Sequence, residues 1–137
     1  MSVQVTILTP DRRVLDRREC HEVELPGRDG TFGVLDNHTP LLAPLGVGVV
    51  RLRSGGQVTE RVAVAEGVVE VNENQVTVTA HAAERSDEID VDRARAARKR
   101  AEDRLHHRHR DTDVERAQAA LARAINRLRA AETHHSD

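Results

Sequence analysis

Residues 3–9 alternate apolar and polar side chains, and most of the apolar ones are β-branched, which is typical of a half-buried β-strand. Tight turns are predicted at Pro26-Gly27, at 54–56 and at 72–74. The same alternation predicts further strands over residues 18–25, 47–53, 57–65, 68–72 and 75–80. Short strands joined by tight turns favour an antiparallel β-sandwich or barrel.

The periodicity changes after Glu84, where Gly and Pro disappear and apolar residues recur at helical spacing. Asp90 is a candidate N-cap for a helix from Val91 to about Leu105, and Thr112-x-x-Glu115 has the spacing of a capping box for a second helix. A polar connector over 106–111 predicts an antiparallel hairpin. The apolar stripes are Val91, Ala94, Ala97, Ala101 and Leu105 in the first helix, and Val114, Ala117, Leu121, Ala124, Leu128 and Ala131 in the second.

The chain is therefore predicted to be an α+β protein with two domains. An all-β sandwich or barrel occupies residues 1–84, and a two-helix antiparallel hairpin, similar to a coiled coil, lies within residues 85–137. Both helical stripes are mostly alanine, whose methyl group buries little surface, and isolated helices of this length are marginal in water. We therefore expect the hairpin to depend on docking, and a weakly docked element can also undock.

Composition excludes several classes of function. One Phe, no Trp and no Tyr among 137 residues predict an aliphatic core and leave no aromatic platform for single-stranded nucleic acids. The formal charge of −2 gives no field that would attract nucleic acid or an anionic membrane. No apolar run approaches the length of a membrane span, so no direct membrane insertion is expected. Cys20 is the single cysteine, which excludes an internal disulfide.

Two pairs of arginines lie on the predicted helices. Arg93 and Arg100 share one line of the first helix, and Arg123 and Arg127 share one on the second, nearly opposite its apolar stripe. Charged helix faces are usually only solvated. Alternatively, four guanidinium groups converge on an anion through bidentate hydrogen bonds. Spacing alone does not select phosphate over carboxylate, so both interpretations remain open.

Neither a metal site nor a catalytic centre is predicted. No nucleophile lies at a sequence spacing from His38 that would indicate a catalytic site. The sequence also contains no Gly-x-x-x-x-Gly-Lys-Ser/Thr loop, which would position a γ-phosphate for transfer. The chain is therefore expected not to be an enzyme. The remaining histidine clusters lack the ligand spacing of a zinc site and are interpreted as a polar connector and a chain end: His106, His107 and His109, and His134 and His135.

The segment from Asp29 to Leu42 has an order of turn and apolar residues that is too specific for an ordinary connecting loop. Gly30 and Gly33 bracket Phe32 in what we expect to be a tight bend, and a turn follows at 37–40. This stretch resembles the hallmark segment of the epsilon subunits of F-type ATP synthases. Residues 67–78 resemble a second familiar segment of that family, although family members usually carry glycine or a small residue where Glu66 stands, and often proline in place of Asp36. The resemblance extends over essentially the whole chain.

A motif at the start of the helical region is similar to one in the bacterial epsilon subunits that bind ATP. It reads Ile89-Asp90-x-x-Arg93-Ala94. In that subset, an upstream glutamate and arginines of both helices complete the site. The resemblance implies an ATP site formed by Glu84, Ile89, Asp90, Arg93, Ala94, Arg100, Arg123 and Arg127, with Asp92 adding negative charge beside it.

The resemblance also implies a function. The chain is expected to be a non-catalytic central-stalk subunit, peripheral on the cytoplasmic side of a bacterial membrane. Its sandwich would dock on the gamma subunit and the c-ring through Thr31, Phe32, Asn37, His38 and Leu42. Its hairpin, when extended, would reach the alpha/beta catalytic head and restrain ATP hydrolysis.

The regulatory ligand that favours the folded hairpin would be ATP, with no covalent cofactor. One alternative is a stalk subunit whose hairpin is a brake without a nucleotide site. A second is a free-standing adaptor unrelated to the synthase.

Overall fold

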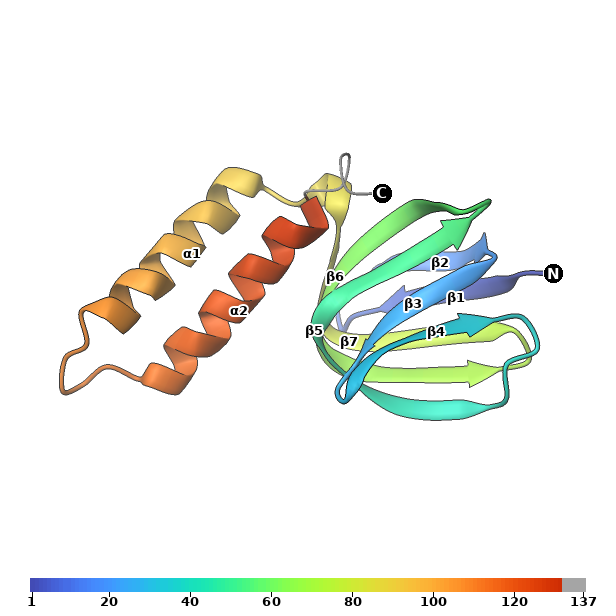
Figure 1. Cartoon of the computed structure of the whole chain (residues 1–137), viewed down its shortest axis with the longest axis horizontal. Helices are drawn as coiled ribbons and strands as arrows, with labels where there is room; N and C mark the ends of the chain where they lie inside the picture. The colour runs from blue at the N-terminus through green and yellow to red at the C-terminus, as the bar shows by residue number, and fades with distance from the viewer. Residues whose placement is uncertain (132–137) are drawn as a thin grey trace.

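The structure, a computed structural model, describes residues 1–131 and consists of a β-sandwich with a helical hairpin packed at one end (Figure 1). The strands are β1 (Val3–Leu8), β2 (Arg13–Cys20), β3 (Glu22–Gly27), β4 (Gly30–Leu35), β5 (Leu41–Ser54), β6 (Gln57–Asn72) and β7 (Gln75–Arg85). A short 3-10 helix, η1 (Ser86–Glu88), leads to helices α1 (Val91–His106) and α2 (Val114–Ala131). The predicted α+β class and sandwich-plus-hairpin architecture are confirmed.

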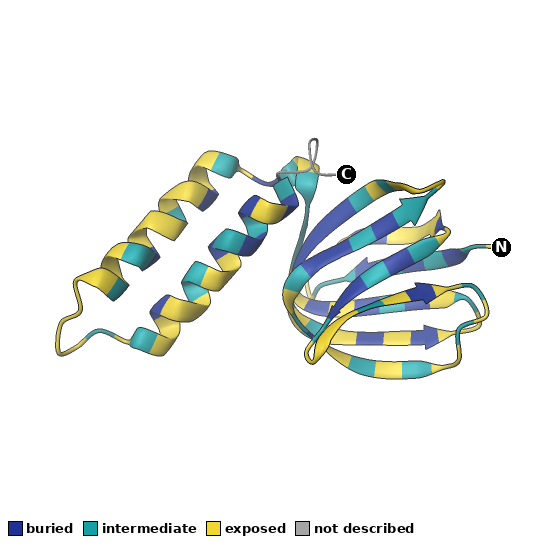
Figure 2. Cartoon of the chain, in the orientation of Figure 1, coloured by how far each residue is buried: buried dark blue, intermediate teal, exposed yellow. Residues whose placement is uncertain are grey.

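All seven strands belong to one hydrogen-bonded sheet that curves around an aliphatic core, in the order β2-β1-β7-β6-β5-β3-β4. Neighbouring strands are antiparallel except β1 and β7, which pair in parallel with Val5 opposite Val76. The largest fully buried side chains are Ile7, Leu25, Leu45 and Leu52, surrounded by valines, and Phe32 packs against them. In Figure 2 buried and exposed positions alternate along the strands, as the period of two predicts.

Several predicted strand boundaries are wrong. Residues 18–25 do not form one strand, because β2 ends at Cys20 and β3 begins at Glu22. Residues 57–65 and 68–72 are one continuous strand, β6, whose residue Glu66 has a left-handed φ of 51°. A single residue in that conformation bends the strand without ending its pairing.

The tight bend predicted around Phe32 is also wrong. Residues 30–35 form strand β4, which pairs with β3 so that Phe32 lies opposite Leu25. Only Gly30 of the two bracketing glycines needs a conformation that other residues rarely adopt, with φ of 143°. Alternation places Val34 in the core and Phe32 against it, and this burial favours a strand despite the glycines.

Both helices begin at aspartate caps. The Asp90 carboxylate accepts a 3.0 Å hydrogen bond from the main-chain N–H of Arg93, which confirms the predicted cap of α1. The predicted Thr112–Glu115 capping box is wrong, because Asp113 caps α2 by accepting a 3.0 Å bond from the Arg116 N–H. The Thr112 hydroxyl instead accepts from the His109 N–H, at 2.9 Å, and stabilises the connector.

The hairpin docks through α2, which contacts β5, β6 and η1, while α1 lies on the outer side of α2 (Figure 1). The apolar contact is small and comprises Val49, Ala63, Ile89 and Ala130. Among residues 1–131, no helix has the length and hydropathy needed to cross a membrane. His134 and His135 lie outside the described residues.

Candidate functional site

A pocket of about 480 Å3 lies between the hairpin and the sandwich. Its volume falls within the range of roughly 300–1,000 Å3 that is usual for small-molecule sites. Strands β5, β6 and β7 contribute mainly valine and alanine to its wall, α1 contributes Ala97, and α2 contributes two arginines. The charged and amide side chains of the wall are Arg12, Glu84, Arg123, Asn126 and Arg127.

Helical spacing explains how α2 presents its arginines to this pocket. Ala120, Arg123, Ala124 and Arg127 all line the pocket, and they follow one another at steps that keep them on one helix face. The two arginines therefore lie along one edge of the apolar stripe, and the prediction that they lie nearly opposite it is wrong. Because Ala120 and Ala124 are small, the guanidinium groups border open space instead of a filled interface.

The arginines of α1 are related to the pocket through Ala97. Arg93 lies four residues before Ala97 and Arg100 three residues after it, so all three occupy one face of the helix. Both arginine side chains are exposed, whereas Ala97 is half-buried in the pocket wall. The helix thus places one cation on each side of its single contact with the pocket.

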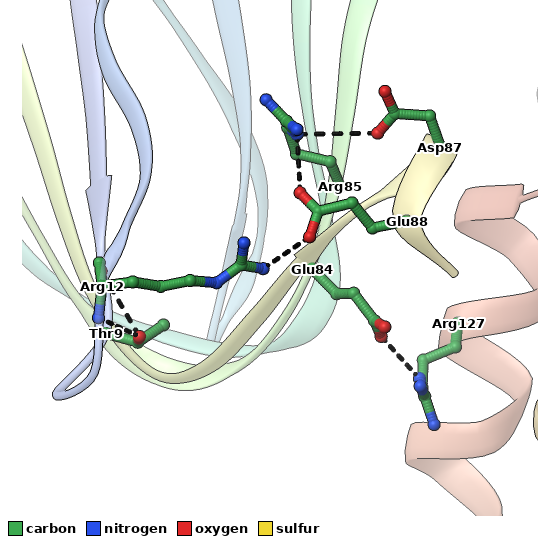
Figure 3. A network of polar contacts seen from close by, with 7 residues as sticks. All are labelled: Thr9, Arg12, Glu84, Arg85, Asp87, Glu88 and Arg127. Carbon is green, nitrogen blue, oxygen red and sulfur yellow. Dashed lines mark hydrogen bonds and ion pairs between the residues drawn. The ribbon is translucent and has the colours of Figure 1, made fainter. Parts of the chain in front are cut away.

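Two ion pairs border the pocket (Figure 3). Arg127 Nε of α2 lies 2.9 Å from Glu84 Oε1 at the end of β7, and both side chains are about one-third exposed. Arg12, in the turn between β1 and β2, lies 2.8 Å from Glu88 Oε2, whose other oxygen is 2.7 Å from Arg85 Nε. The hydrogen bond from Arg12 is the main reason that the pKa of Glu88 lies below its usual value.

Three of the predicted ATP-site residues meet at this pocket, namely Glu84, Arg123 and Arg127. The other five are not part of its wall. Ile89 is buried in the contact between α2 and the sandwich, Asp90 caps α1, and Ala94 is buried on α1. The remaining two, Arg93 and Arg100, are exposed.

Two of the charged and amide side chains in the pocket wall were not predicted as site residues, those of Arg12 and Asn126. Arg12 reaches the pocket because the β1–β2 turn lies beside the end of β7. No pattern of residues near Arg12 in the sequence predicts this contact. Asn126 carried a signal, because it is a polar residue between Ile125 and Leu128 on the packed side of α2. Its amide is 8% exposed and donates to the Gly48 and Val64 carbonyls, at 2.7 and 3.4 Å.

None of the residues predicted to dock on the rotor lines the pocket. Phe32 is half-buried against the core, whereas Thr31 is exposed. The Asn37 N–H donates a 2.7 Å bond to the Asn74 side chain, and His38 Nδ1 lies 2.7 Å from the Thr39 carbonyl. Leu42 is 70% exposed.

Family comparison agrees with this architecture. The chain matches two family models of the ATP synthase delta/epsilon chain, the β-sandwich domain over residues 2–86 and the long α-helix domain over residues 87–132. The chain belongs to the delta/epsilon-chain family of ATP synthases. Within that family it is an epsilon chain of the bacterial F-type enzyme, a non-catalytic subunit of the central stalk. The predicted resemblance and the expected lack of enzymatic activity are thereby confirmed.

Bacterial relatives align over nearly the whole chain. The ATP synthase epsilon chain of Bacillus velezensis is 49% identical over 130 residues, which cover 95% of this chain and 97% of the relative. The epsilon chain of Bacillus subtilis has the same identity and coverage. That of Symbiobacterium thermophilum is 50% identical over 129 residues, covering 94% and 92% of the two chains.

A solved structure shares the fold at lower identity. A chain in the cryo-EM structure of the Euglena gracilis mitochondrial ATP synthase superposes with a TM-score of 0.78 at 20% identity. The match covers 96% of this chain and 81% of that one. At this identity the likeness concerns the fold alone.

Proposed function

We propose that this subunit binds ATP in the pocket between its hairpin and its sandwich, and that bound ATP stabilises the docked hairpin. The observation that carries the proposal is the convergence of Arg123, Arg127 and Glu84 on one pocket that both domains line. Guanidinium groups bind phosphate oxygens through paired, charge-assisted hydrogen bonds. A ligand held by both walls opposes their separation.

The wall offers different chemistry to the two ends of a nucleotide. The arginines of α2 provide positive charge for the phosphates. The strands provide a shallow alanine-rich surface, at Ala63, Ala65, Ala82 and Ala83, against which a flat base can lie. Arg93 and Arg100, on either side of Ala97, would extend the positive charge toward α1. Ile89, Asp90 and Ala94 would act indirectly, by fixing where α1 begins.

Glu84 has a defined part in this proposal. Its carboxylate lies 2.9 Å from Arg127 Nε and so orients the guanidinium group toward the pocket that both residues line. A preoriented cation loses less conformational entropy when it binds. The carboxylate also reduces the net charge of the pocket, and the site is therefore suited to reversible binding.

Ligand binding of this kind would regulate the hairpin. A ligand present at 100 times its dissociation constant, and bound only to the docked form, stabilises that form by about 2.7 kcal/mol, or roughly a hundredfold in population. The apolar docking contact of α2 is small enough for such an energy to control. The undocked, extended hairpin would reach the alpha/beta catalytic head and restrain ATP hydrolysis there.

The sandwich would attach the subunit to the rotor, on the gamma subunit and the c-ring, at the cytoplasmic side of the bacterial membrane. Exposed apolar side chains favour this: Leu42 of β5 is 70% exposed and Val68 of β6 is 44% exposed. Pro44 lies opposite Val68 and adds to the same face. With Thr31, Phe32, Asn37 and His38 nearby along the chain, this face would provide the docking surface.

The test is a calorimetric titration of the full chain with ATP. Binding that is weakened at least tenfold by Arg127→Ala, and unaffected by Arg116→Ala on the exposed side of α2, would support the nucleotide site, since a charged hydrogen bond contributes about 1.5–3 kcal/mol. Circular dichroism of both variants checks that the sandwich remains folded. Absence of ATP binding to the unmutated chain would instead favour a hairpin that acts as a brake without a nucleotide.

A second experiment tests rotor docking. Leu42→Asp should reduce copurification with the gamma subunit, because it buries a charge in the proposed contact. Gln57→Asp, at the exposed start of β6, is the matched control. Normal copurification of the Leu42→Asp variant would contradict the proposed docking face, and failure of the unmutated chain to bind gamma would favour an unrelated adaptor.

A further inference from the structure

Arg12 is a pocket residue that comes from a part of the sandwich unrelated to the predicted ATP motif. It lies in the turn between β1 and β2, and its position is fixed locally. The Thr9 N–H donates a 2.9 Å bond to the Arg12 carbonyl, and the Thr9 hydroxyl accepts from the Arg12 N–H at 3.3 Å. The turn therefore holds the base of this side chain in a defined place.

The guanidinium group of Arg12 is shared between the pocket and an ion pair. It lines the pocket together with Glu84, Arg123 and Arg127, and it also lies 2.8 Å from Glu88 Oε2. In Figure 3 Arg12 extends from the sandwich to Glu88, and Arg127 extends from α2 to the carboxylate of Glu84. The Arg12 side chain is 46% exposed, so it is not confined to its present partner.

We propose that Arg12 is a phosphate-binding residue of the sandwich, which exchanges its contact with Glu88 for the phosphate oxygens of a nucleotide in the pocket. The inference rests on the proposed nucleotide site and extends it. With Arg12 on one wall and Arg123 and Arg127 on the other, a polyphosphate contacts cations of both domains. The ligand then links the sandwich directly to the hairpin.

Glu88 has the opposite effect in this arrangement. Its carboxylate competes with the phosphate for the Arg12 guanidinium group, and its second oxygen is already paired with Arg85. Removing the charge of Glu88 should leave Arg12 more available. The two partners of one ion pair are therefore expected to change nucleotide affinity in opposite directions, which a merely structural ion pair would not do.

The test compares four forms of the full chain by calorimetric titration with ATP and, separately, with inorganic tripolyphosphate. Arg12→Ala should weaken both ligands by about tenfold or more. Glu88→Gln should bind both at least as tightly as the unmutated chain. The matched control is Arg13→Ala, whose side chain is 62% exposed, pairs with Asp16 and does not line the pocket. It should bind normally.

Each other outcome would contradict the inference and would show which of its steps is wrong. If Arg12→Ala binds both ligands normally, Arg12 does not contact the phosphates. If Arg12→Ala and Glu88→Gln weaken binding equally, the ion pair acts by holding the pocket's shape. If Arg12→Ala weakens ATP but not tripolyphosphate, Arg12 acts on another part of the nucleotide. If the unmutated chain binds neither ligand, the nucleotide site itself is wrong and the role of Arg12 fails with it.

Discussion

Asn126 of α2 donates a 2.7 Å hydrogen bond from its side-chain amide to the main-chain carbonyl of Gly48 in β5. The same nitrogen lies 3.4 Å from the carbonyl of Val64, the residue that pairs with Gly48 across β5 and β6. These contacts join positions far apart in the sequence. They make the hairpin specific for one place on the sheet, in an interface whose apolar part is small.

Replacing Asn126 with Ala should loosen the hairpin while leaving the sandwich folded. The change removes a buried donor from the Gly48 carbonyl, which costs about 1–3 kcal/mol. Hydrogen exchange should accelerate in residues 114–131 and remain slow in β5 and β6. Gln118→Ala, on the exposed side of α2, is the control and should leave exchange unchanged. Equal protection of α2 in both variants would show that the amide does not hold it.

Truncating a buried leucine of β5 should destabilise the sandwich far more than truncating an exposed leucine of the same strand. Leu52 is fully buried, so Leu52→Ala should lower the free energy of unfolding by about 2–5 kcal/mol through lost burial and a residual cavity. Leu42→Ala, at a side chain 70% exposed on the same strand, should change it by less than about 0.5 kcal/mol. Urea denaturation measures both. Similar losses for the two variants would contradict the assigned burial.

Glu66→Gly should stabilise the chain. Glu66 has a φ of 51°, a conformation that costs a side-chain-bearing residue about 1–2 kcal/mol, whereas glycine adopts it freely. Glycine's greater freedom in the unfolded chain offsets part of this gain, so a net increase of up to about 1 kcal/mol is expected. Thermal denaturation provides the measurement. Glu70→Gly, on the same strand without a positive φ, should destabilise instead.

The thiol of Cys20 should be inert in the folded chain. It is 2% exposed, and burial raises its pKa from 9.0 to about 11. A disulfide reagent at pH 8 should therefore react only after urea unfolding. Rapid reaction in the folded state would show that β2 opens readily.

The same shift predicts an alkaline loss of stability. The folded state keeps the Cys20 proton between pH 9 and 11, whereas the unfolded chain releases it, so stability should fall as pH rises through this window. The chain has no Tyr and only Lys99 as lysine, so few other groups titrate there. Cys20→Ala should show a shallower slope, and parallel slopes would contradict the assigned shift.

Protonation of Glu88 should contribute to the loss of folding stability at low pH. Its pKa is lowered chiefly by the Arg12 hydrogen bond, so it contributes stability above the ordinary carboxyl pKa and loses it as pH falls through the folded value. Unfolding curves between pH 7 and 3 should fall more steeply for the unmutated chain than for Glu88→Gln. Identical pH dependence would mean that the ion pair with Arg12 does not persist in solution.

Features that depend on residues close together in the sequence could be predicted from it. The Asp90 cap and the helix from Val91 to about Leu105 follow from local spacing, and the structure confirms both. Strand β4 could not be predicted, because its glycines favour a turn and only pairing with β3 makes a strand the better solution. The parallel pairing of β1 with β7 joins distant segments and has no local signal.

The candidate site also contains some residues that could be predicted from the sequence and others that could not. Arg123 and Arg127 could be grouped by helical spacing, and their link to Glu84 came from family resemblance. The structure brings these three to one pocket. Arg12 was missed because its approach depends on how the sheet curves, not on any residue near it in the sequence.

The small docking contact of α2 has a thermal consequence. The change in heat capacity on undocking scales with the apolar surface exposed, and Val49, Ala63, Ile89 and Ala130 expose little of it. The enthalpy of undocking should therefore vary little between cold and warm conditions. The free energy of undocking should then change nearly linearly with temperature, without the curvature that a large apolar interface would give it.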